Sequence, residues 1–137
     1  MSINEIIPVA NFPEKSGKYK LAQMIIDNSY YLRFSDIPAG EIGISSIYFT
    51  NDIIKETAKL LGREYPKVLS KSEKFRNVEI PSPISSWYSL IGDGFAKINV
   101  ERKEIEYFFG KSCIYNLGIN EEFNENIKGL VYPWKLP

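Results

Sequence analysis

The chain has 137 residues and a formal net charge of zero, because 17 Lys and Arg residues balance 17 Asp and Glu residues. It contains no histidine and one cysteine, Cys113, which excludes Ser-His-Asp triads, Cys-His pairs, histidine-rich metal sites and an internal disulfide. Zero net charge gives no support for a general electrostatic attraction to nucleic acid or to an anionic membrane.

Length and composition predict one folded domain spanning residues 1–137. Hydrophobic residues make up 44% of the chain and charged residues 25%, which is typical of a packed core rather than of disorder. The N-terminal residues lack the basic segment of a signal peptide, and the apolar runs are too short to span a bilayer. We therefore expect a cytoplasmic protein that holds no metal and no cofactor.

The N-terminal part of the chain contains one ambiguous segment. Apolar residues at helical spacing predict a helix from Ser16 to Asp27, followed by a strand from Tyr30 to Phe34. The alternative is a pair of strands joined by a turn at Asp27-Asn28-Ser29. Period-two alternation then predicts a strand from Ile42 to Phe49.

The central part contains the strongest helix prediction, from Asp52 to Leu61, with Gly62 where a left-handed residue ends a helix. Its apolar stripe consists of Ile53, Ile54, Thr57, Ala58, Leu60 and Leu61. Lys67 to Arg76 is predicted to be a basic connector, and Val78 to Ile80 a short strand.

The C-terminal half begins with a second predicted helix. Ser82 followed by Pro83 has the order of a helix start, and the helix would end at Gly92-Asp93-Gly94. Its apolar positions are Ile84, Trp87, Tyr88 and Ile91. A hairpin is expected near residues 95–109, with Glu101 to Glu104 as its loop.

Two elements are expected after the hairpin. Ser112 to Leu117 indicates a third strand, and Asn120 is expected to cap a last helix with Phe123, Ile127, Leu130 and Val131 at helical spacing. Strands mixed irregularly with helices indicate an α+β domain. We expect a single compact domain in which an antiparallel sheet packs with two to four helices.

Four features could carry chemistry, and each has a simpler explanation. Gly92-Asp93-Gly94 lacks the third glycine or Lys-Ser/Thr of a nucleotide loop and is interpreted as a turn. Glu101, Glu104 and Glu106 could form a carboxylate pair, but a solvated turn is favoured. Cys113 is expected to be a buried core residue without a catalytic role, since no histidine can activate it. Ser82 is expected to cap a helix.

Aromatic residues make up 14% of the chain, which fits strand positions in a β-rich domain and also a partner surface. The charges form two poles. Lys55 to Arg76 contains seven basic and three acidic residues, a net charge of +4, whereas Glu104 to Glu125 contains five acidic residues and Lys111, a net charge of −4. Each pole could be a solvated face or could dock a partner of opposite charge.

This overall profile is similar to that of bacterial immunity proteins, a likeness of type that covers no motif. It implies a small protein-binding domain, not an enzyme, that neutralises a cognate toxin such as a basic nuclease encoded by an adjacent gene. The expected partner-binding residues are Glu104, Glu106, Tyr107, Phe108, Glu121, Glu122 and Glu125. The alternatives are a small enzyme that uses carboxylate and tyrosine chemistry (a lyase, isomerase or glycoside-processing protein) and an accessory subunit of a larger assembly.

Overall fold

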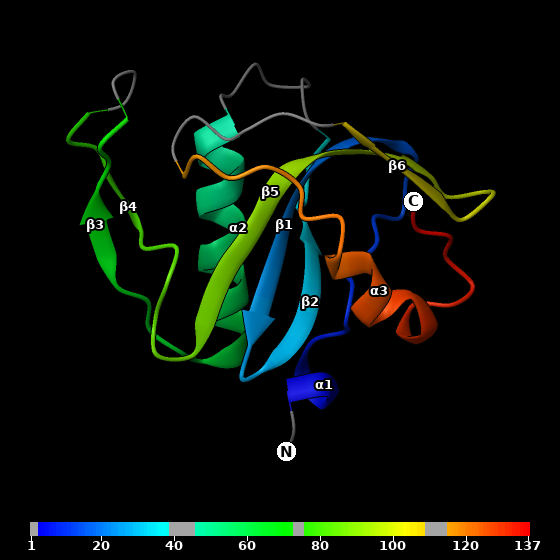
Figure 1. Ribbon diagram of the computed structural model, residues 1–137, viewed down its shortest axis with the longest axis horizontal. Helices are drawn as coiled ribbons and strands as arrows, with labels where there is room; N and C mark the ends of the chain where they lie inside the picture. The colour runs from blue at the N-terminus through cyan, green and yellow to red at the C-terminus, as the bar shows by residue number, and fades with distance from the viewer. Residues whose placement is uncertain (1–2, 39–45, 73–75, 109–114) are drawn as a thin grey trace.

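Four strands form an antiparallel sheet in the computed structural model, which describes residues 3–38, 46–72, 76–108 and 115–137 (Figure 1). Their order across the sheet is β2-β1-β5-β6, and β3 and β4 form a separate two-stranded hairpin. The strands are β1 (Gly17–Ile26), β2 (Ser29–Phe34), β3 (Lys67–Leu69), β4 (Glu79–Pro81), β5 (Tyr88–Asn99) and β6 (Glu104–Phe108). The helices are α1 (Ile3–Ile6), α2 (Ser46–Leu61), α3 (Phe123–Ile127) and the 3-10 turn η1 (Lys128–Leu130). The predicted α+β class is confirmed.

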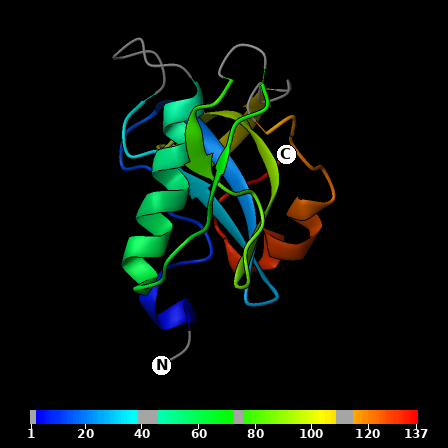
Figure 2. The same ribbon diagram turned by 90° about the vertical axis from the view of Figure 1, so that its left-hand side faces the viewer.

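The sheet is covered on both faces, with α2 on one side and α3 on the other (Figure 2). Each face has its own hydrophobic cluster. The α2 side contains Ile7, Ala22, Met24, Ile26, Tyr31, Ile53, Ile54, Tyr88 and Leu90. The α3 side contains Ala10, Tyr19, Leu21, Leu32, Phe34, Ala96, Ile98, Ile105, Tyr107, Phe123, Ile127 and Val131.

This double coverage explains why the predicted helix from Ser16 to Asp27 is wrong. The segment is the central strand β1, and six consecutive residues from Tyr19 to Met24 are buried. A strand buried on both faces loses the period-two alternation that identifies a strand, so its apolar positions can also fit a helix. The alternative pair of strands is confirmed, with Asp27 and Asn28 at positive φ in the turn.

Helix α2 is confirmed and begins earlier than predicted, at Ser46. The strand predicted from Ile42 to Phe49 is wrong at residues 46–49, which form the first turn of α2. Residues 42–45 lie outside the described residues. The period-two pattern of apolar residues here is short, and the segment adopts the helical conformation of the longer amphipathic helix into which it continues. The stripe is correct at Ile53, Ile54, Thr57 and Ala58, but Leu60 is 46% exposed.

The predicted helix from Ser82 to Ile91 is wrong, as is the turn at Gly92-Asp93-Gly94. Strand β5 begins at Tyr88 and runs through all three of these residues. The ladder with β1 shifts register between Gln23 and Met24, so β5 carries a bulge next to the glycines. Ser82 caps no helix; its hydroxyl bonds the backbone N–H and C=O of Ile84 in a tight turn.

The glycines of β5 are required because another segment crosses the sheet at this point. A Cβ at Gly92 would collide with the Gln23 carboxamide, and a Cβ at Gly94 would lie 2.6 Å from Cγ1 of Ile119. The Asp93 N–H donates to the Gly118 carbonyl at 3.1 Å. Glycine in a strand often marks such a close approach, and here it admits the segment that leads into α3.

The hairpin prediction is confirmed, because β5 pairs with β6 from Phe95 opposite Phe108 to Asn99 opposite Glu104. The last helix is also confirmed as α3 continued by η1. Part of the predicted strand from Ser112 to Leu117 lies outside the described residues. Its described part, residues 115–117, is not a strand.

Chain segments cover part of both sheet edges. Along β2, the Leu32 N–H donates to the Val9 carbonyl at 2.8 Å, and the Asn11 side chain bonds the backbone of Phe34. Along β6, the Ile105 N–H donates to the Lys135 carbonyl at 3.1 Å. Phe12 and Trp134 stack with ring centroids 4.1 Å apart, so these two covering segments also contact each other.

Candidate functional site

Strand β6 places its two aromatic residues on opposite sides of the sheet, as alternation along a strand predicts. Tyr107 is 7% exposed, and its hydroxyl donates to Oδ1 of Asn124 at 2.8 Å. Phe108 is 39% exposed. Of the two proposed apolar contacts, Phe108 is therefore the one at the surface, while Tyr107 holds α3 against the sheet.

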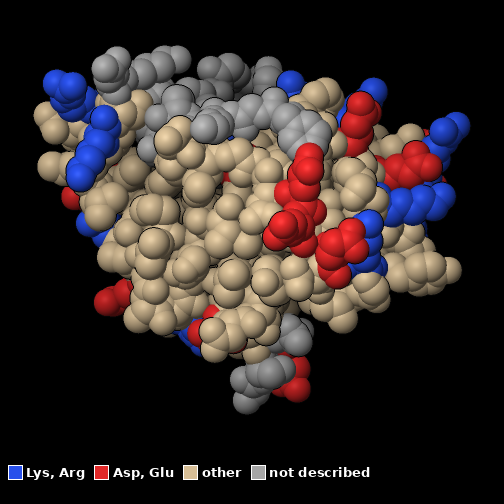
Figure 3. Space-filling model, viewed as in Figure 1, with Lys and Arg blue, Asp and Glu red and all other residues tan. Residues whose placement is uncertain are grey.

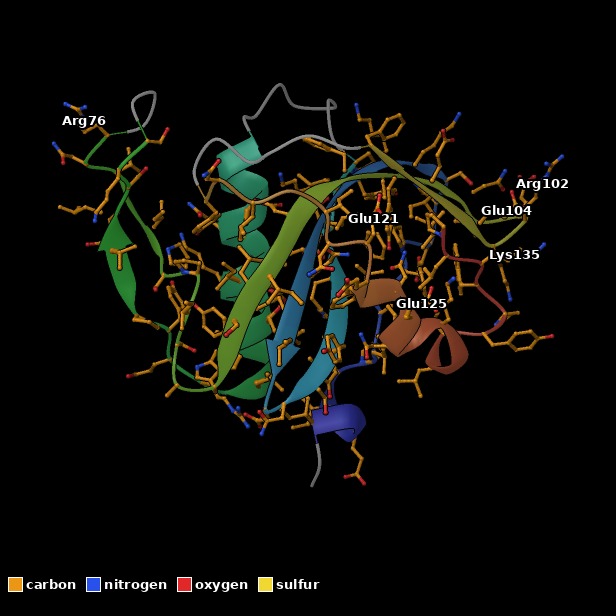
Figure 4. All side chains as sticks on the ribbon, viewed as in Figure 1. Arg76, Arg102, Glu104, Glu121, Glu125 and Lys135 are labelled. Carbon is orange, nitrogen blue, oxygen red and sulfur yellow. The ribbon has the colours of Figure 1, made fainter. Side chains whose placement is uncertain are left out.

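The five predicted glutamates fall into two groups, one on β6 and one around the start of α3; Figure 4 labels Glu104 of the first group and Glu121 and Glu125 of the second. Glu104 lies at the end of the β5–β6 hairpin with Arg102 and Lys135 nearby, and its carboxylate is 3.7 Å from the Lys135 ammonium. Glu106 is on the same strand and pairs in register with Lys97. This end of the molecule is therefore mixed in charge, because basic residues outside the sequence window Glu104 to Glu125 come back to it.

The second group lies at the start of α3, and we call Glu121, Glu122 and Glu125 the acidic strip. All three are exposed. Glu125 pairs with Lys128 at 3.0 Å, whereas Glu121 and Glu122 form no ion pair within the described part of the chain. Figure 3 shows carboxylates gathered on this face with some Lys and Arg side chains beside them, and further Lys and Arg side chains at the opposite end of the molecule.

The position of the acidic strip is set from inside the fold. The Gln23 carboxamide accepts a hydrogen bond from the Asn120 N–H at 2.7 Å and donates to the Asn120 carbonyl at 3.0 Å. The predicted cap at Asn120 is wrong, because α3 begins at Phe123 with Glu122 at its N-cap position and no side-chain cap. The Asn120 side chain instead accepts from the Glu122 N–H at 3.0 Å in the turn that leads into the helix. A residue on β1 thereby fixes the backbone immediately before Glu121.

Sequence reasoning missed two exposed apolar residues just beyond the acidic strip. Leu130 is 67% exposed and Tyr132 is 85% exposed. Leu130 was assigned to the buried face of the last helix, but the chain tightens into η1 there and turns it outward. Large exposed apolar side chains next to charged residues are typical of partner contacts, and Tyr is enriched at binding hot spots.

A buried polar network joins α2 to the sheet on the other face. The Lys20 ammonium lies 3.0 Å from the Asp93 carboxylate, and both side chains are at most 2% exposed. The Thr50 hydroxyl donates to the same carboxylate at 3.1 Å, and the Tyr115 hydroxyl donates to Asn51 and to the Pro81 carbonyl. These contacts tie α2, β1, β4 and β5 together.

The tyrosines were the other proposed source of chemistry. Burial raises the pKa of Tyr88 and Tyr107 to about 12, and it also raises the pKa of Tyr115. A tyrosinate base would need a shift in the opposite direction. Burial therefore makes these three hydroxyls weaker acids, which suits hydrogen-bond donors in a core.

A small hollow lies between the end of β2 and α2. Arg33, which is 3% exposed, lines this hollow together with Asp36, Asp52 and Glu56. The Arg33 Nη1 donates to the Pro8 carbonyl at 3.2 Å, while its Nε has no hydrogen-bond partner among the described residues. Burial lowers the pKa of Arg33 to about 10, with Asp36 and Glu56 acting against that shift. The hollow holds about 30 Å³, which is space for water.

The remaining candidate features give no site. In the described ranges, no group of three or more His, Cys, Asp or Glu residues could hold a metal ion. Glu101 is exposed in the turn before β6, as a solvated turn predicts, and Cys113 lies outside the described residues. None of the described helices has the length and apolar character needed to cross a membrane.

Comparisons with known proteins identify no relative. No protein-family model matches the chain, and no curated protein and no solved structure match it.

Proposed function

We propose that the chain is a protein-binding domain that neutralises a basic partner, as immunity proteins neutralise toxins, and that the acidic strip is its docking surface. The observation that carries the proposal is the pair Glu121 and Glu122, which are exposed and form no ion pair in the described part of the chain. Exposed carboxylates of this kind steer a basic partner toward the surface and can pair with its Lys and Arg side chains.

Apolar contacts for such a partner lie next to the strip. Tyr132 and Leu130 follow α3 directly and present large apolar side chains to solvent. Interface energy usually concentrates in a few aromatic or arginine side chains, while surrounding charges set the association rate. Tyr132 is therefore proposed as the anchor and the glutamates as the steering charges, with Phe108 as a further contact.

The partner is proposed to be a toxin such as a basic nuclease, encoded next to this chain and blocked by it in the cytoplasm. Glutamates on a nuclease-binding face would occupy the basic groups that otherwise contact phosphates. This assignment of the partner rests on the charge of the strip and on the likeness in type to immunity proteins. The experiment therefore begins with the product of the neighbouring gene.

The test is binding kinetics of that product against the wild-type chain and the Glu121→Lys/Glu122→Lys variant, at low and high salt. We expect the variant to associate at least about tenfold more slowly at low salt and to lose much of the salt dependence, because steering acts on the on-rate. Tyr132→Ala should instead raise the dissociation rate by about tenfold or more, as loss of an anchor does.

The matched control is Glu5→Lys/Glu14→Lys, which makes the same change in net charge at two exposed positions outside both the acidic strip and the segment Lys55 to Arg76. An equal effect of the control would show that only net charge matters and that the strip is not the docking surface. If changes between Lys55 and Arg76 abolished binding while the strip variant bound normally, the opposite pole would be the interface. If the neighbouring product did not bind at all, the immunity proposal would be wrong.

A further inference from the structure

The β3–β4 hairpin stands at the end of the molecule opposite the acidic strip, with β3 as its outer strand (Figure 1). Figure 2 views this end directly. All three residues of β3 are exposed, and it pairs with β4 through Lys67 opposite Pro81, Val68 opposite Ile80 and Leu69 opposite Glu79. The hairpin is thus held to the body through β4, and β3 is available on its other side.

The hydrogen bonds of the hairpin show which backbone groups of β3 point outward. The Ser70 N–H donates to the Val78 carbonyl and the Ser82 N–H to the Pro66 carbonyl, both at 2.8 Å. Because hydrogen-bonded pairs alternate in an antiparallel ladder, the N–H and C=O of Val68 point toward β4, and the N–H and C=O of Lys67 and Leu69 point away from it. No hydrogen bond within the described residues reaches these outward groups.

The other edge of the hairpin is blocked at Pro81. Pro81 lies on β4 and has no N–H to donate, and its carbonyl accepts a hydrogen bond from the Tyr115 hydroxyl at 2.8 Å. Within the described part of the hairpin, β3 is therefore the edge without such a block. It offers two donors and two acceptors on residues i and i+2, the spacing at which an added strand forms its ladder.

The side chains around this edge indicate what kind of strand it fits. Leu69, Val68 and Val78 are 58%, 41% and 40% exposed, so the hairpin presents apolar surface on a small element. Lys71 and Arg76 are exposed next to it and have no ion pair in the described ranges, and Lys67 lies 3.7 Å from Glu79. Figure 4 labels Arg76 at the tip of this basic end.

We propose that β3 accepts an extended segment of a protein partner in which carboxylate side chains alternate with branched aliphatic ones. The backbone of that segment would bond the outward groups of Lys67 and Leu69. Its aliphatic side chains would cover Val68 on one face of the hairpin, and its carboxylates, on the opposite face, would pair with Lys71 and Arg76. A second copy of this chain is a poorer occupant, because its β3 is Lys67-Val68-Leu69 and brings no carboxylate to this basic edge. This surface is separate from the acidic strip and does not depend on the proposed function.

The experiment uses the full-length chain and a capped peptide that alternates Glu and Val, with a peptide that has Lys in place of Glu as the control. Binding is followed by amide resonances and amide hydrogen exchange. We expect the Lys67 and Leu69 amides to become protected by the acidic peptide, while the Ser70 amide, already bonded to β4, changes little. The basic peptide should not produce this protection, because like charges oppose it.

Leu69→Pro tests the backbone bond, because it removes an outward N–H that the hairpin does not use. We expect about tenfold weaker binding of the acidic peptide, the effect of losing one hydrogen bond of about 1.4 kcal/mol. Leu69→Ala keeps that N–H and should cause a smaller loss. If Leu69→Pro impairs folding, the exchange pattern of the wild-type chain decides.

Three results would overturn the proposal. These are equal binding of the basic peptide, protection at sites away from β3, and self-association of the wild-type chain that Leu69→Pro abolishes, which would make a second copy the occupant. Kinetics of the neighbouring gene product with Leu69→Pro separate this proposal from the acidic strip, since that binding should be unchanged.

Discussion

Removing one partner of the buried ion pair between Lys20 and Asp93 should destabilise the fold far more than removing both. The two charged groups are 3.0 Å apart, with exposures of 2% and 0%, so neither can exchange its partner for water. In Asp93→Asn the Lys20 ammonium stays buried without its counter-charge. In Lys20→Met the Asp93 carboxylate loses the ammonium and keeps hydrogen bonds such as that from Thr50.

Each single variant is expected to lose about 3–5 kcal/mol of unfolding free energy, the usual cost of leaving a buried charge without its partner. Since domains of this size are stable by about 5–15 kcal/mol, this is a large part of the total. The double variant leaves neither charge in the core, and replacement of a buried pair by neutral groups of similar volume is often close to neutral. We expect the double variant to be more stable than either single variant.

The measurement is urea unfolding of the wild-type chain, the two single variants and the double variant. The dependence of unfolding free energy on urea concentration is compared among them, because a change in midpoint reports stability only when this slope is unchanged. Favourable coupling of about 2 kcal/mol or more is expected from the double-mutant cycle. If a single variant does not fold but the double variant does, the same conclusion follows. Losses that simply add, with coupling below about 0.5 kcal/mol, would refute the reasoning and show that the two charges act independently.

Two further predictions concern the segment that carries the acidic strip. Gly92→Ala should lower the unfolding free energy by about 1–3 kcal/mol, because the new methyl displaces the Gln23 carboxamide from both of its hydrogen bonds with Asn120. The measurements are the unfolding free energy and the hydrogen exchange of the Asn120 amide, and unchanged values of both would contradict the prediction. The folded-state pKa of Tyr107 is raised from 10.0 to about 12, so its contribution to stability is complete below pH 10 and lost as the pH rises toward 12. Tyr107→Phe should weaken the loss of stability over that range, and an identical alkaline profile would disprove it.

Local signals identified the elements that have one exposed face. Helix α2 has polar residues on its outer side, and the β5–β6 hairpin alternates buried and exposed residues, so both have a clear period. Strand β1 has no such period, because the clusters on the two faces of the sheet both draw residues from it. The glycines of β5 looked like a turn because nothing in the local sequence shows that Ile119 and Asn120 cross the strand there.

The candidate site was likewise predictable where it depends on neighbours in the sequence, and not where it depends on residues brought together by the fold. The sequence identified Glu121 and Glu122 as part of an acidic pole. Alternation along β6 puts only one of Tyr107 and Phe108 in the core, and that residue is Tyr107. It did not show that Lys135 returns to the side of Glu104, because that pairing joins residues 31 positions apart in the chain. A charge count over a continuous window includes only neighbours in sequence, whereas the field at the surface also depends on residues brought back by the fold.

The two separate clusters give the molecule one fluorescent reporter on each side of its sheet. The chain has two tryptophans: Trp87 packs against the cluster on the α2 side, and Trp134 packs against the cluster on the α3 side. Trp87 donates its indole N–H to the Glu64 carbonyl and lies under the Arg63 guanidinium, while Trp134 stacks on Phe12, so their surroundings differ. Single-tryptophan variants would therefore record the melting of each layer separately, and coincident transitions would identify the two layers as one cooperative unit.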